Sequence, residues 1–408
     1  MVRGTDITDR KLIYRNRDEG DFPERLVIEL TKEWDLRYGE NPGQHGMICT
    51  LDTVNGIDVG TVPRLTNLQS VRTDGKGKGG LSLTNTMDIT RAMDDLKFFP
   101  GVLAVAIKKH NVVSGFAMAV DDSQTQRDIF RLARDSDLRS NFGGTAVFNA
   151  PLGMEAAEAM FELGGVSPFF VDVVAAPGYE AGVVGYIQGR KKDIRIGEFA
   201  SLDRLPRFVG DETYGLVSIK EMPTGRIGIQ DVYLTGIRKV EDLVLDPSVR
   251  DGNTAKEFVV EKDPTSRELR DLLTAWHLNI TGARSNGIVV VRDGVTIAVG
   301  SGQVERVGAV EQAIVKGMQK AMDRQGIEYD PLMGMSGYEQ LAENPFEGAV
   351  CSSDAFFPFR DSIDTLARVG VTAVVQPYGS NRDWESVQAA NEHNMAMPAS
   401  DKRCFGHF

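Results

Sequence analysis

The stretch GVLAVAIKKHN, residues 101–111, sets the pattern from which the fold is predicted. Its apolar run, 101–107, predicts a buried strand, and two lysines and a histidine follow it directly. Beyond this strand, segments with helical spacing alternate with short apolar runs. We expect helices over 124–135 and 153–165 and strands over 145–149 and 169–177.

The second half of the chain repeats this alternation. Residues 285–302 contain two β-branched runs joined by Asp293-Gly294, a strong signal for a hairpin turn. Residues 309–324 carry helical spacing, and 370–379 has the composition of a buried strand. Because strands alternate with helices in both halves, we predict an α/β fold with helices on both faces of its sheets.

The length of the chain indicates several packed units. Its 408 residues exceed the size at which one hydrophobic core usually stops growing. A boundary is expected between residues 200 and 265, which are rich in charges and contain prolines. The predicted segments are a lead-in (1–34) with one short helical candidate (22–34), a first subdomain (35–205), a connecting region (206–265) and a second subdomain (266–408).

Composition excludes several classes of function. The net charge of −12 makes the chain a poor partner for nucleic acid, because binding to phosphates needs clustered Lys and Arg. Its apolar runs are too short to cross a membrane, and its polar first residues do not resemble a signal peptide, so we expect a cytoplasmic protein. Three cysteines without a C-x-x-C or H-x-E pattern predict neither a disulfide framework nor a zinc site.

The charged end of the first strand is a candidate catalytic site. Loops that leave the carboxyl ends of strands form the ligand crevice in α/β sheets, and Lys109 and His110 lie at such an end. Neighbouring ammonium groups disfavour the imidazolium form, which leaves a neutral base for proton abstraction. Alternatively, these side chains only cap a strand at the solvent edge. Adjacent strand residues point to opposite faces, so the two can share a site only if the strand ends between them.

Two further segments contain side chains that are suited to ligand binding. In LRYGENPGQ (36–44), glycines and a proline place Arg37 on a turn, where a guanidinium can capture phosphate or carboxylate. In SSDAFFPFRD (352–361), three phenylalanines and two aspartates match neither a helical nor a strand period, and their rings can form a slot for a flat heterocycle. A surface turn and a core loop are the respective alternatives.

The order of these motifs along the chain resembles one enzyme family, the AICAR transformylases, which form the formyltransferase half of a bifunctional purine-biosynthesis protein. AICAR is aminoimidazole carboxamide ribonucleotide. The resemblance runs from about residue 36 to the last residue. The segments that carry it are LRYGENPGQ, LSLTNTMDITRAMDDLK, AIKKHN, DLRSNFGG, FVDVVAAPGYE, SNGIVVVRDGVTIAVGSGQVERV, SSDAFFPFRDSID, GVTAVVQPYGSNRD and KRCFGHF. The family's usual partner, an IMP cyclohydrolase domain, is expected before residue 36 and is not found in this sequence.

The resemblance implies a fold and a reaction. The family builds two cytidine-deaminase-like α/β/α subdomains that lack the zinc site, and pairs them in an intertwined homodimer with active sites at the interface. It transfers a formyl group from 10-formyltetrahydrofolate to the 5-amino group of AICAR, giving FAICAR and tetrahydrofolate in purine biosynthesis. It also allows a monovalent cation, K⁺, near Asp354, bound mostly through backbone oxygens.

The resemblance also assigns residues to roles. The catalytic residues would be Lys109, His110 and Asn286. Contacts to AICAR would come from Arg37, Tyr38, Gly39, Gly144, Arg306, Phe356 and Arg403. Contacts to the folate would come from Val307, Phe359 and Asp361.

The chain departs from the family at the Lys-His loop. The family usually has a proline where this chain has Val113, and losing the fixed φ of proline is expected to loosen the loop that aims His110. Two alternatives therefore stand beside AICAR transformylase. One is a paralogue that formylates a related aminoimidazole or another amine, and the other is a catalytically silent protein that binds a nucleotide or a folate.

Overall fold

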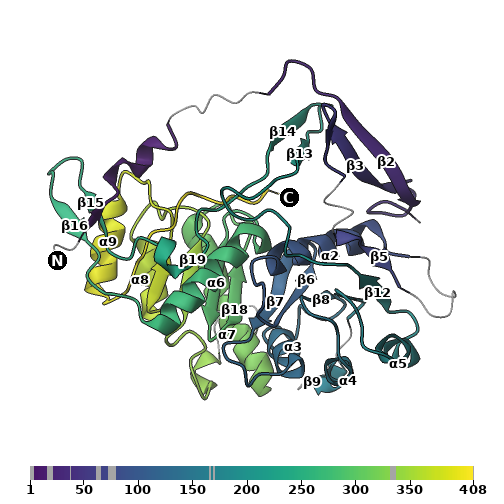
Figure 1. The fold of residues 1–408 in the computed structure, drawn as a ribbon. Helices are drawn as coiled ribbons and strands as arrows, with labels where there is room; N and C mark the ends of the chain where they lie inside the picture. Colours follow the sequence, from purple (N-terminus) through teal and green to yellow (C-terminus); the bar gives the residue numbers. More distant parts are fainter. Residues whose placement is uncertain are drawn as a thin grey trace.

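One ten-stranded mixed sheet organises the molecule (Figure 1). The computed structural model describes residues 4–15, 22–36, 38–60, 66–71, 80–164, 167–168, 171–330 and 337–407. In spatial order the strands are β20 (Ala373–Val375), β19 (Val350–Ser353), β17 (Ile288–Arg292), β18 (Val295–Gly300), β7 (Val112–Met118), β6 (Ala104–Lys109), β8 (Thr145–Phe148), β11 (Val173–Ala176), β12 (Arg195–Glu198) and β5 (Gln69–Ser70). The halves join where β18 meets β7, at Val295 opposite Ala117.

The two halves repeat one sequence of elements. The series α2, β6, β7, α3, β8, α4, β11 is matched by α6, β17, β18, α7, β19, α8, β20. In each half the first two strands form an antiparallel hairpin, the third pairs antiparallel with the first, and the fourth pairs parallel with the third. The strand order is therefore mirrored about the junction of β18 with β7.

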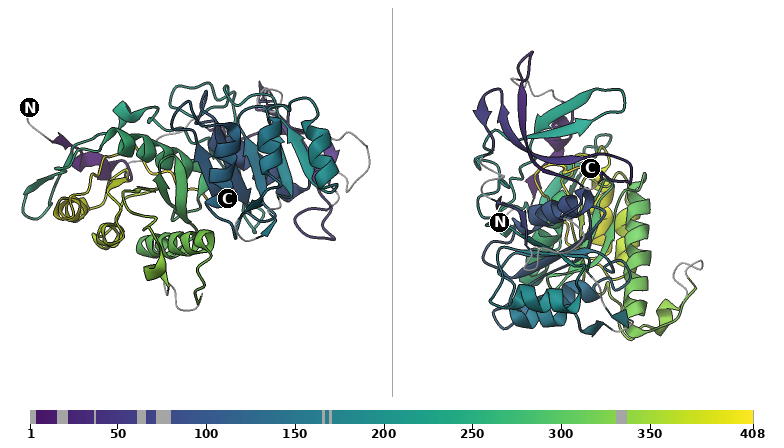
Figure 2. Two further views of the ribbon diagram at one scale, coloured as in Figure 1. Left: turned by 90° about the horizontal axis from the view of Figure 1, so that it is seen from below. Right: turned by 90° about the vertical axis from the view of Figure 1, so that its right-hand side faces the viewer.

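Helices pack on both faces of this sheet, as Figure 2 shows. The helices are α2 (Leu83–Leu96), α3 (Gln126–Asp135), α4 (Met154–Ala159), α5 (Val183–Arg190), α6 (Ser266–Gly282), α7 (Arg306–Gln325), α8 (Asp361–Arg368) and α9 (Asp383–Glu392). Side chains alternate along β6, so Ala104 and Ala106 pack with α2 and α6, whereas Val105 and Ile107 pack with α3, α4 and α5. The expected α/β fold is confirmed at this level.

Two small β units stand apart from the main sheet in Figure 1. One contains β2 (Ile28–Asp35), β3 (Met47–Val54) and β4 (Ile57–Asp58), and the other is the hairpin of β13 (Val217–Glu221) and β14 (Ile227–Asp231). We call these two units together the arm. A third small sheet joins β1 (Thr5–Asp6), β15 (Pro247–Arg250) and β16 (Glu257–Val259).

The described residues also contain several short elements. They are the 3₁₀ helices η1 (Thr8–Leu12), η2 (Val240–Asp242) and η4 (Tyr338–Gln340) and the strands β9 (Leu163–Gly164) and β10 (Ser167–Pro168). Among the residues that the structure describes, no helix combines the length and the apolar character of a membrane span.

Several predicted elements are confirmed and one is wrong. The helices over 124–135 and 309–324 appear as α3 and α7, and Asp293-Gly294 forms the turn between β17 and β18. The helix predicted over 22–34 is wrong, because residues 28–35 form β2 and pair with β3 along its whole length. Cross-strand pairing here overrides a weak helical pattern.

Other elements are shorter than predicted. The helix expected over 153–165 ends at Ala159, because the chain turns there toward β9. In the strand expected over 169–177, residues 169 and 170 are outside the described residues, and the described part pairs over β11. In the strand expected over 370–379, pairing covers β20 and an isolated bridge at Gln376.

Candidate functional site

His110 occupies a tight turn at the end of the first predicted strand. β6 ends at Lys109 and β7 begins at Val112, so His110 and Asn111 form a two-residue hairpin loop. Both have positive φ angles, 55° and 65°, as a type I′ turn requires. The strand therefore does end between Lys109 and His110, which is the geometric condition for a shared site. His110 is exposed, and the Lys109 ammonium donates a hydrogen bond of 2.8 Å to the carbonyl of Phe142.

Gly144 lies close to this turn. A side chain at Gly144 would meet the carbonyl oxygens of Asn141 and Lys108, each at 3.1 Å. Lys109, His110 and Gly144 thus come together at one end of β6.

Val113 lies just after this turn and is held by strand pairing. Val113 is buried in β7 opposite Lys108 and packs against Gly282, where an added Cβ would come within 2.9 Å of it. Val113 is therefore held both by its strand partner and by its packing against α6.

A buried ion pair lies beneath the turn. The Nζ atom of Lys108 is 2.9 Å from Oδ2 of Asp95, and both side chains are fully buried. Thr281 donates its hydroxyl to Asp95 at 2.5 Å and accepts a 3.1 Å hydrogen bond from Lys108 through its carbonyl. Burial raises the pKa of Asp95 and lowers that of Lys108, while their mutual attraction opposes both shifts.

A second group of predicted residues gathers around Asp354. Its carboxylate accepts hydrogen bonds from Ser285, at 2.6 Å, and from the buried guanidinium of Arg306. Asn286 lies next to Ser285 and donates its side-chain amide to the carbonyl of Gln303 at 2.9 Å. The start of α7 and the segment before β17 are thereby tied to the residue that follows β19.

The C-terminal tail joins this second group. Cys404 donates its backbone N–H to the carbonyl of Asp354 at 2.9 Å. The neighbouring Arg403 guanidinium lies 5.2 Å from the ring of Tyr14 and 4.8 Å from that of Phe405. Tyr14 in turn meets Phe356 edge to face at 5.8 Å. Residues far apart in sequence thus converge on one place.

The predicted folate residues lie at the starts of α7 and α8 and in the segment just before α8. Val307 is the second residue of α7, directly after Arg306. Phe359 is exposed, with the guanidinium of Arg382 5.0 Å from its ring, and Asp361 begins α8 and accepts the N–H of Ser362 at 2.7 Å.

The remaining predicted residues lie in the arm. Gly39 donates its N–H to Gln44 at 2.6 Å in the loop between β2 and β3, beside Tyr38. Arg37 is outside the described residues. Within the described ranges, no hydrogen bond, ion pair or ring contact joins Lys109 or His110 to the group around Asp354.

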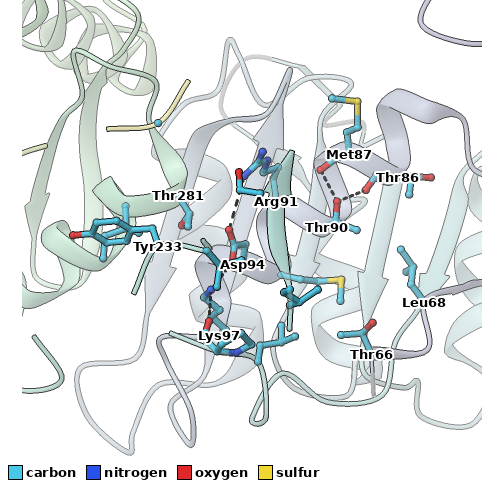
Figure 3. A pocket seen from close by; sticks show the side chains of 18 of the residues that line it. Thr66, Leu68, Thr86, Met87, Thr90, Arg91, Asp94, Lys97, Tyr233 and Thr281 are labelled. Atoms are coloured by element: carbon cyan, nitrogen blue, oxygen red, sulfur yellow. Dashed lines mark hydrogen bonds and ion pairs between the residues drawn. The ribbon is translucent and has the colours of Figure 1, made fainter. Parts of the chain in front are cut away.

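A cavity of about 1530 Å³ opens between α2, the arm and the C-terminal tail (Figure 3). Of the predicted site residues, Arg403 lines it. The cavity has other polar lining residues that were not predicted from the sequence. They include Thr86, Thr90, Arg91, Asp94, Lys97, Lys220, Thr281 and His407.

Helix α2 supplies four of these side chains, Thr86, Thr90, Arg91 and Asp94, and Lys97 follows it directly. Asp94 pairs with Lys97 at 2.7 Å and with Arg91 at 4.0 Å, so this wall carries charges of both signs. Burial would raise the pKa of Asp94, but the two cations lower it below its ordinary value. The signal that could have identified the helix is its cap: Ser82 and Asn85 form a capping box ahead of the first turn.

Comparisons with known proteins agree with the ordered motifs. Residues 9–316 match the model of the family described as AICARFT/IMPCHase bienzyme. The chain is 30% identical over 389 residues to the bifunctional purine biosynthesis protein PurH of Persephonella marina, 31% over 387 residues to that of Aquifex aeolicus and 33% over 388 residues to that of Magnetococcus marinus. Each alignment covers 95% of this chain and 62% of the relative, so the chain spans less than two thirds of these proteins.

Proposed function

Because the chain belongs to the AICARFT/IMPCHase bienzyme family, we propose that it is the formyltransferase that acts on AICAR. The reaction transfers the formyl group of 10-formyltetrahydrofolate to the 5-amino group of AICAR and yields FAICAR and tetrahydrofolate. The observation that carries the proposal is Lys109-His110 at the end of β6, with the histidine exposed on a tight turn, in a chain of this family. We place the reaction in purine biosynthesis and in the cytoplasm.

The chemistry requires a base. The 5-amino group of AICAR is conjugated with its ring and is a poor nucleophile, so its nitrogen must lose a proton as it attacks the formyl carbon. His110 takes that proton, and the bond from the formyl carbon to N10 of the folate then breaks as N10 gains a proton. Lys109 stabilises the oxyanion that develops on the formyl oxygen, and Asn286 holds the formyl group in line. A positioned base contributes about 10² to 10⁴ in rate.

Arg403 is the better placed cation for the 5′-phosphate. It lines the cavity, whereas the charge of Arg306 is already engaged by buried Asp354. We assign Arg306 to holding the loop that carries Phe356 against the AICAR base. Arg37, Tyr38, Gly39 and Gly144 complete the proposed contacts to AICAR, and Val307, Phe359 and Asp361 those to the pterin.

We propose that a monovalent cation binds near Asp354. Oδ1 of Asn279 is buried and has no hydrogen-bond partner among the described residues. It lies close to the backbone of Gly287, and Asp354 supplies a carboxylate on the same side. A K⁺ ion held there by Asn279 and backbone oxygens would add positive charge behind the loop of Phe356.

A second copy of the chain is the proposed partner. The arm exposes large apolar side chains on both of its units: Leu30, Met47, Ile57, Ile219, Met222 and Ile227. Exposed apolar clusters of this kind mark protein interfaces. An interface also explains why the His110 turn and the Asp354 group make no contact within one chain, since a partner can bring them together.

The repeated halves support two equivalent subdomains. The series of helix, hairpin, helix, strand, helix and strand occurs once in residues 35–205 and once in 266–408. We propose that these are the two cytidine-deaminase-like units, with 206–265 as their connection and 1–34 as a lead-in, of which Arg10 and Tyr14 contact the second unit.

A formyl-transfer assay with AICAR and 10-formyltetrahydrofolate tests the function. Wild-type protein is expected to catalyse formyl transfer. His110→Ala is expected to lose at least about 100-fold in kcat, while calorimetry still shows that it binds AICAR. Wild-type binding of AICAR without turnover would favour a silent binding protein. Turnover with another aminoimidazole alone would favour the paralogue.

A further inference from the structure

The two hairpin turns of the repeated halves are held by equivalent aspartates. In the second half, Asp271 of α6 accepts the N–H groups of Asp293 and Gly294 at 2.8 and 3.0 Å. In the first half, Asp88 of α2 accepts the N–H of Asn111 at 2.7 Å and also interacts with the N–H of His110. Counted from Leu83 and Ser266, each aspartate is the sixth residue of its helix.

The halves differ directly beneath these turns. Lys108 lies two residues before His110, and the equivalent residue, two before Asp293, is Val291. Asp95 lies seven residues after Asp88, and seven residues after Asp271 the chain has Leu278. The valine and the leucine are fully buried in one apolar cluster. The second half therefore forms the same arrangement of elements with an apolar pair at the place where the first half buries two charges.

The buried charges contact the loop that carries the histidine. The Lys108 ammonium donates to the carbonyl of Asn111 at 3.4 Å, in addition to its contacts with Asp95 and Thr281. Asn111 is thus held at its N–H by Asp88 and at its carbonyl by Lys108. Two consecutive residues with positive φ and without glycine are costly, so fixed contacts of this kind select one geometry for the turn.

We propose that Asp88 and the buried Lys108–Asp95 pair are positioning residues that fix His110 for proton abstraction. The inference rests on the proposed role of His110 as the base. Replacing a buried ion pair by apolar residues is often neutral or stabilising, so the need for a stable fold does not explain this pair. A turn that must aim a catalytic side chain explains both the pair and its absence beneath the Asp293-Gly294 turn, which carries no proposed catalytic side chain.

The same network connects the turn to the cavity. Thr86 and Thr90 of α2 line the cavity (Figure 3), while Asp88 and Asp95 lie on another face of the same helix. Thr281 lines the cavity and holds both members of the ion pair. A substrate in the cavity would therefore meet the elements that fix His110.

The decisive variant copies the second half into the first. Lys108→Val combined with Asp95→Leu is expected to fold with undiminished stability, to lose at least about tenfold in kcat and to keep KM for AICAR within about twofold. An unchanged kcat in the folded double variant would overturn the proposal.

The two equivalent aspartates provide a matched pair. Asp88→Ala is expected to lower kcat at least about tenfold, and Asp88→Asn to recover much of it because an amide oxygen still accepts the turn N–H groups. Asp271→Ala removes the same contacts from a turn without a proposed catalytic group and should leave kcat unchanged. Equal kcat losses in Asp88→Ala and Asp271→Ala would mean that the contacts serve only folding, against the proposal.

A spectroscopic measurement separates this inference from the proposed function. If the wild type shows no transfer, the function fails, and the His110 side-chain resonances and the exchange of the Asn111 N–H then test the positioning alone. In the double variant we expect altered His110 resonances and at least about tenfold faster exchange of that N–H. If the His110 resonances and the exchange rate of the Asn111 N–H were unchanged in the double variant, the inference would be refuted, whatever reaction the protein catalyses.

Discussion

The imidazole of His277 stacks on the ring of Phe98, with 4.6 Å between the centroids and 20° between the planes. Both side chains are buried at the contact between α6 and the end of α2, and the Nε2 atom of His277 is 2.9 Å from the carbonyl of Ile237. Burial is the main cause that lowers the pKa of His277 to about 4.

This buried histidine predicts a loss of stability in acid. Between about pH 6.5 and pH 4 the unfolded chain binds a proton at His277 that the folded chain does not bind, so stability falls as the pH falls. A pKa of about 4 in place of the ordinary value of about 6.5 corresponds to about 3 kcal/mol. Urea unfolding of wild type and His277→Gln should be compared at pH 7.5 and pH 4.5. Between these pH values the free energy of unfolding should decrease less for the variant than for wild type. Parallel decreases would contradict the assignment.

Asp383 predicts the opposite dependence on pH. Burial raises its pKa to about 7, although the N–H groups of Gly379 and Ser380 and the charge of Arg10 act against this shift. The folded chain therefore holds a proton at Asp383 between about pH 4 and pH 7 that the unfolded chain lacks, and stability falls as the pH rises through this window. Asp383→Asn is expected to be more stable than wild type at pH 8, by up to about 4 kcal/mol, and equal to it at pH 4. Calorimetric unfolding at both pH values provides the check, and a variant less stable than wild type at pH 8 would refute it.

Gly115 predicts a steric effect close to the candidate site. A Cβ there would collide with the carbonyl of Ala133 and lie 2.7 Å from Oγ of Ser136, because β7 packs tightly on the end of α3. Gly115→Ala should lower the free energy of unfolding by about 1–3 kcal/mol. Gly185→Ala in α5 is the control: no atom lies within 4 Å of the added Cβ, and the better helix former should stabilise by about 1 kcal/mol. If the denaturant midpoints of Gly115→Ala and Gly185→Ala both rose or both fell relative to wild type, these expectations would be contradicted.

The Lys108–Asp95 pair predicts strong coupling between two variants. Lys108→Met leaves the Asp95 carboxylate buried without its cation and should cost about 3–5 kcal/mol of stability. Combining it with Asp95→Leu should restore most of that loss. A double-mutant cycle by urea unfolding measures the coupling, and additive effects would show that the two charges do not interact.

The sequence predicts the second hairpin turn better than the first. Asp-Gly is a preferred pair for a type I′ turn, so Asp293-Gly294 was identifiable. His110-Asn111 has no glycine, and its conformation depends on contacts from α2 that lie far away in sequence. Helix α2 itself carried a readable signal, since Ile89, Ala92, Met93 and Leu96 follow helical spacing and are all buried.

The arrangement around Asp354 could not be predicted from spacing. Ser285, Arg306, Cys404 and Asp354 lie on separate segments, and their meeting depends on the pairing of β17 with β19 and on the path of the tail. The resemblance named Arg306 and Arg403 as similar cations. Only the fold shows that Arg306 is buried against the carboxylate of Asp354, whereas Arg403 lines the cavity.

The pairing of β1 with β15 has a consequence for how the chain is made. Thr5 donates its N–H to the carbonyl of Asp246 at 2.9 Å, and Arg10 donates to the carbonyls of Pro377 and Ser400. At 5–20 residues per second, a ribosome needs roughly 10–50 s after adding Thr5 to reach Asp246, and longer to reach Ser400. During synthesis β1 therefore has no partner until Asp246 has emerged, and the contacts of Arg10 form only after Pro377 and Ser400 have emerged.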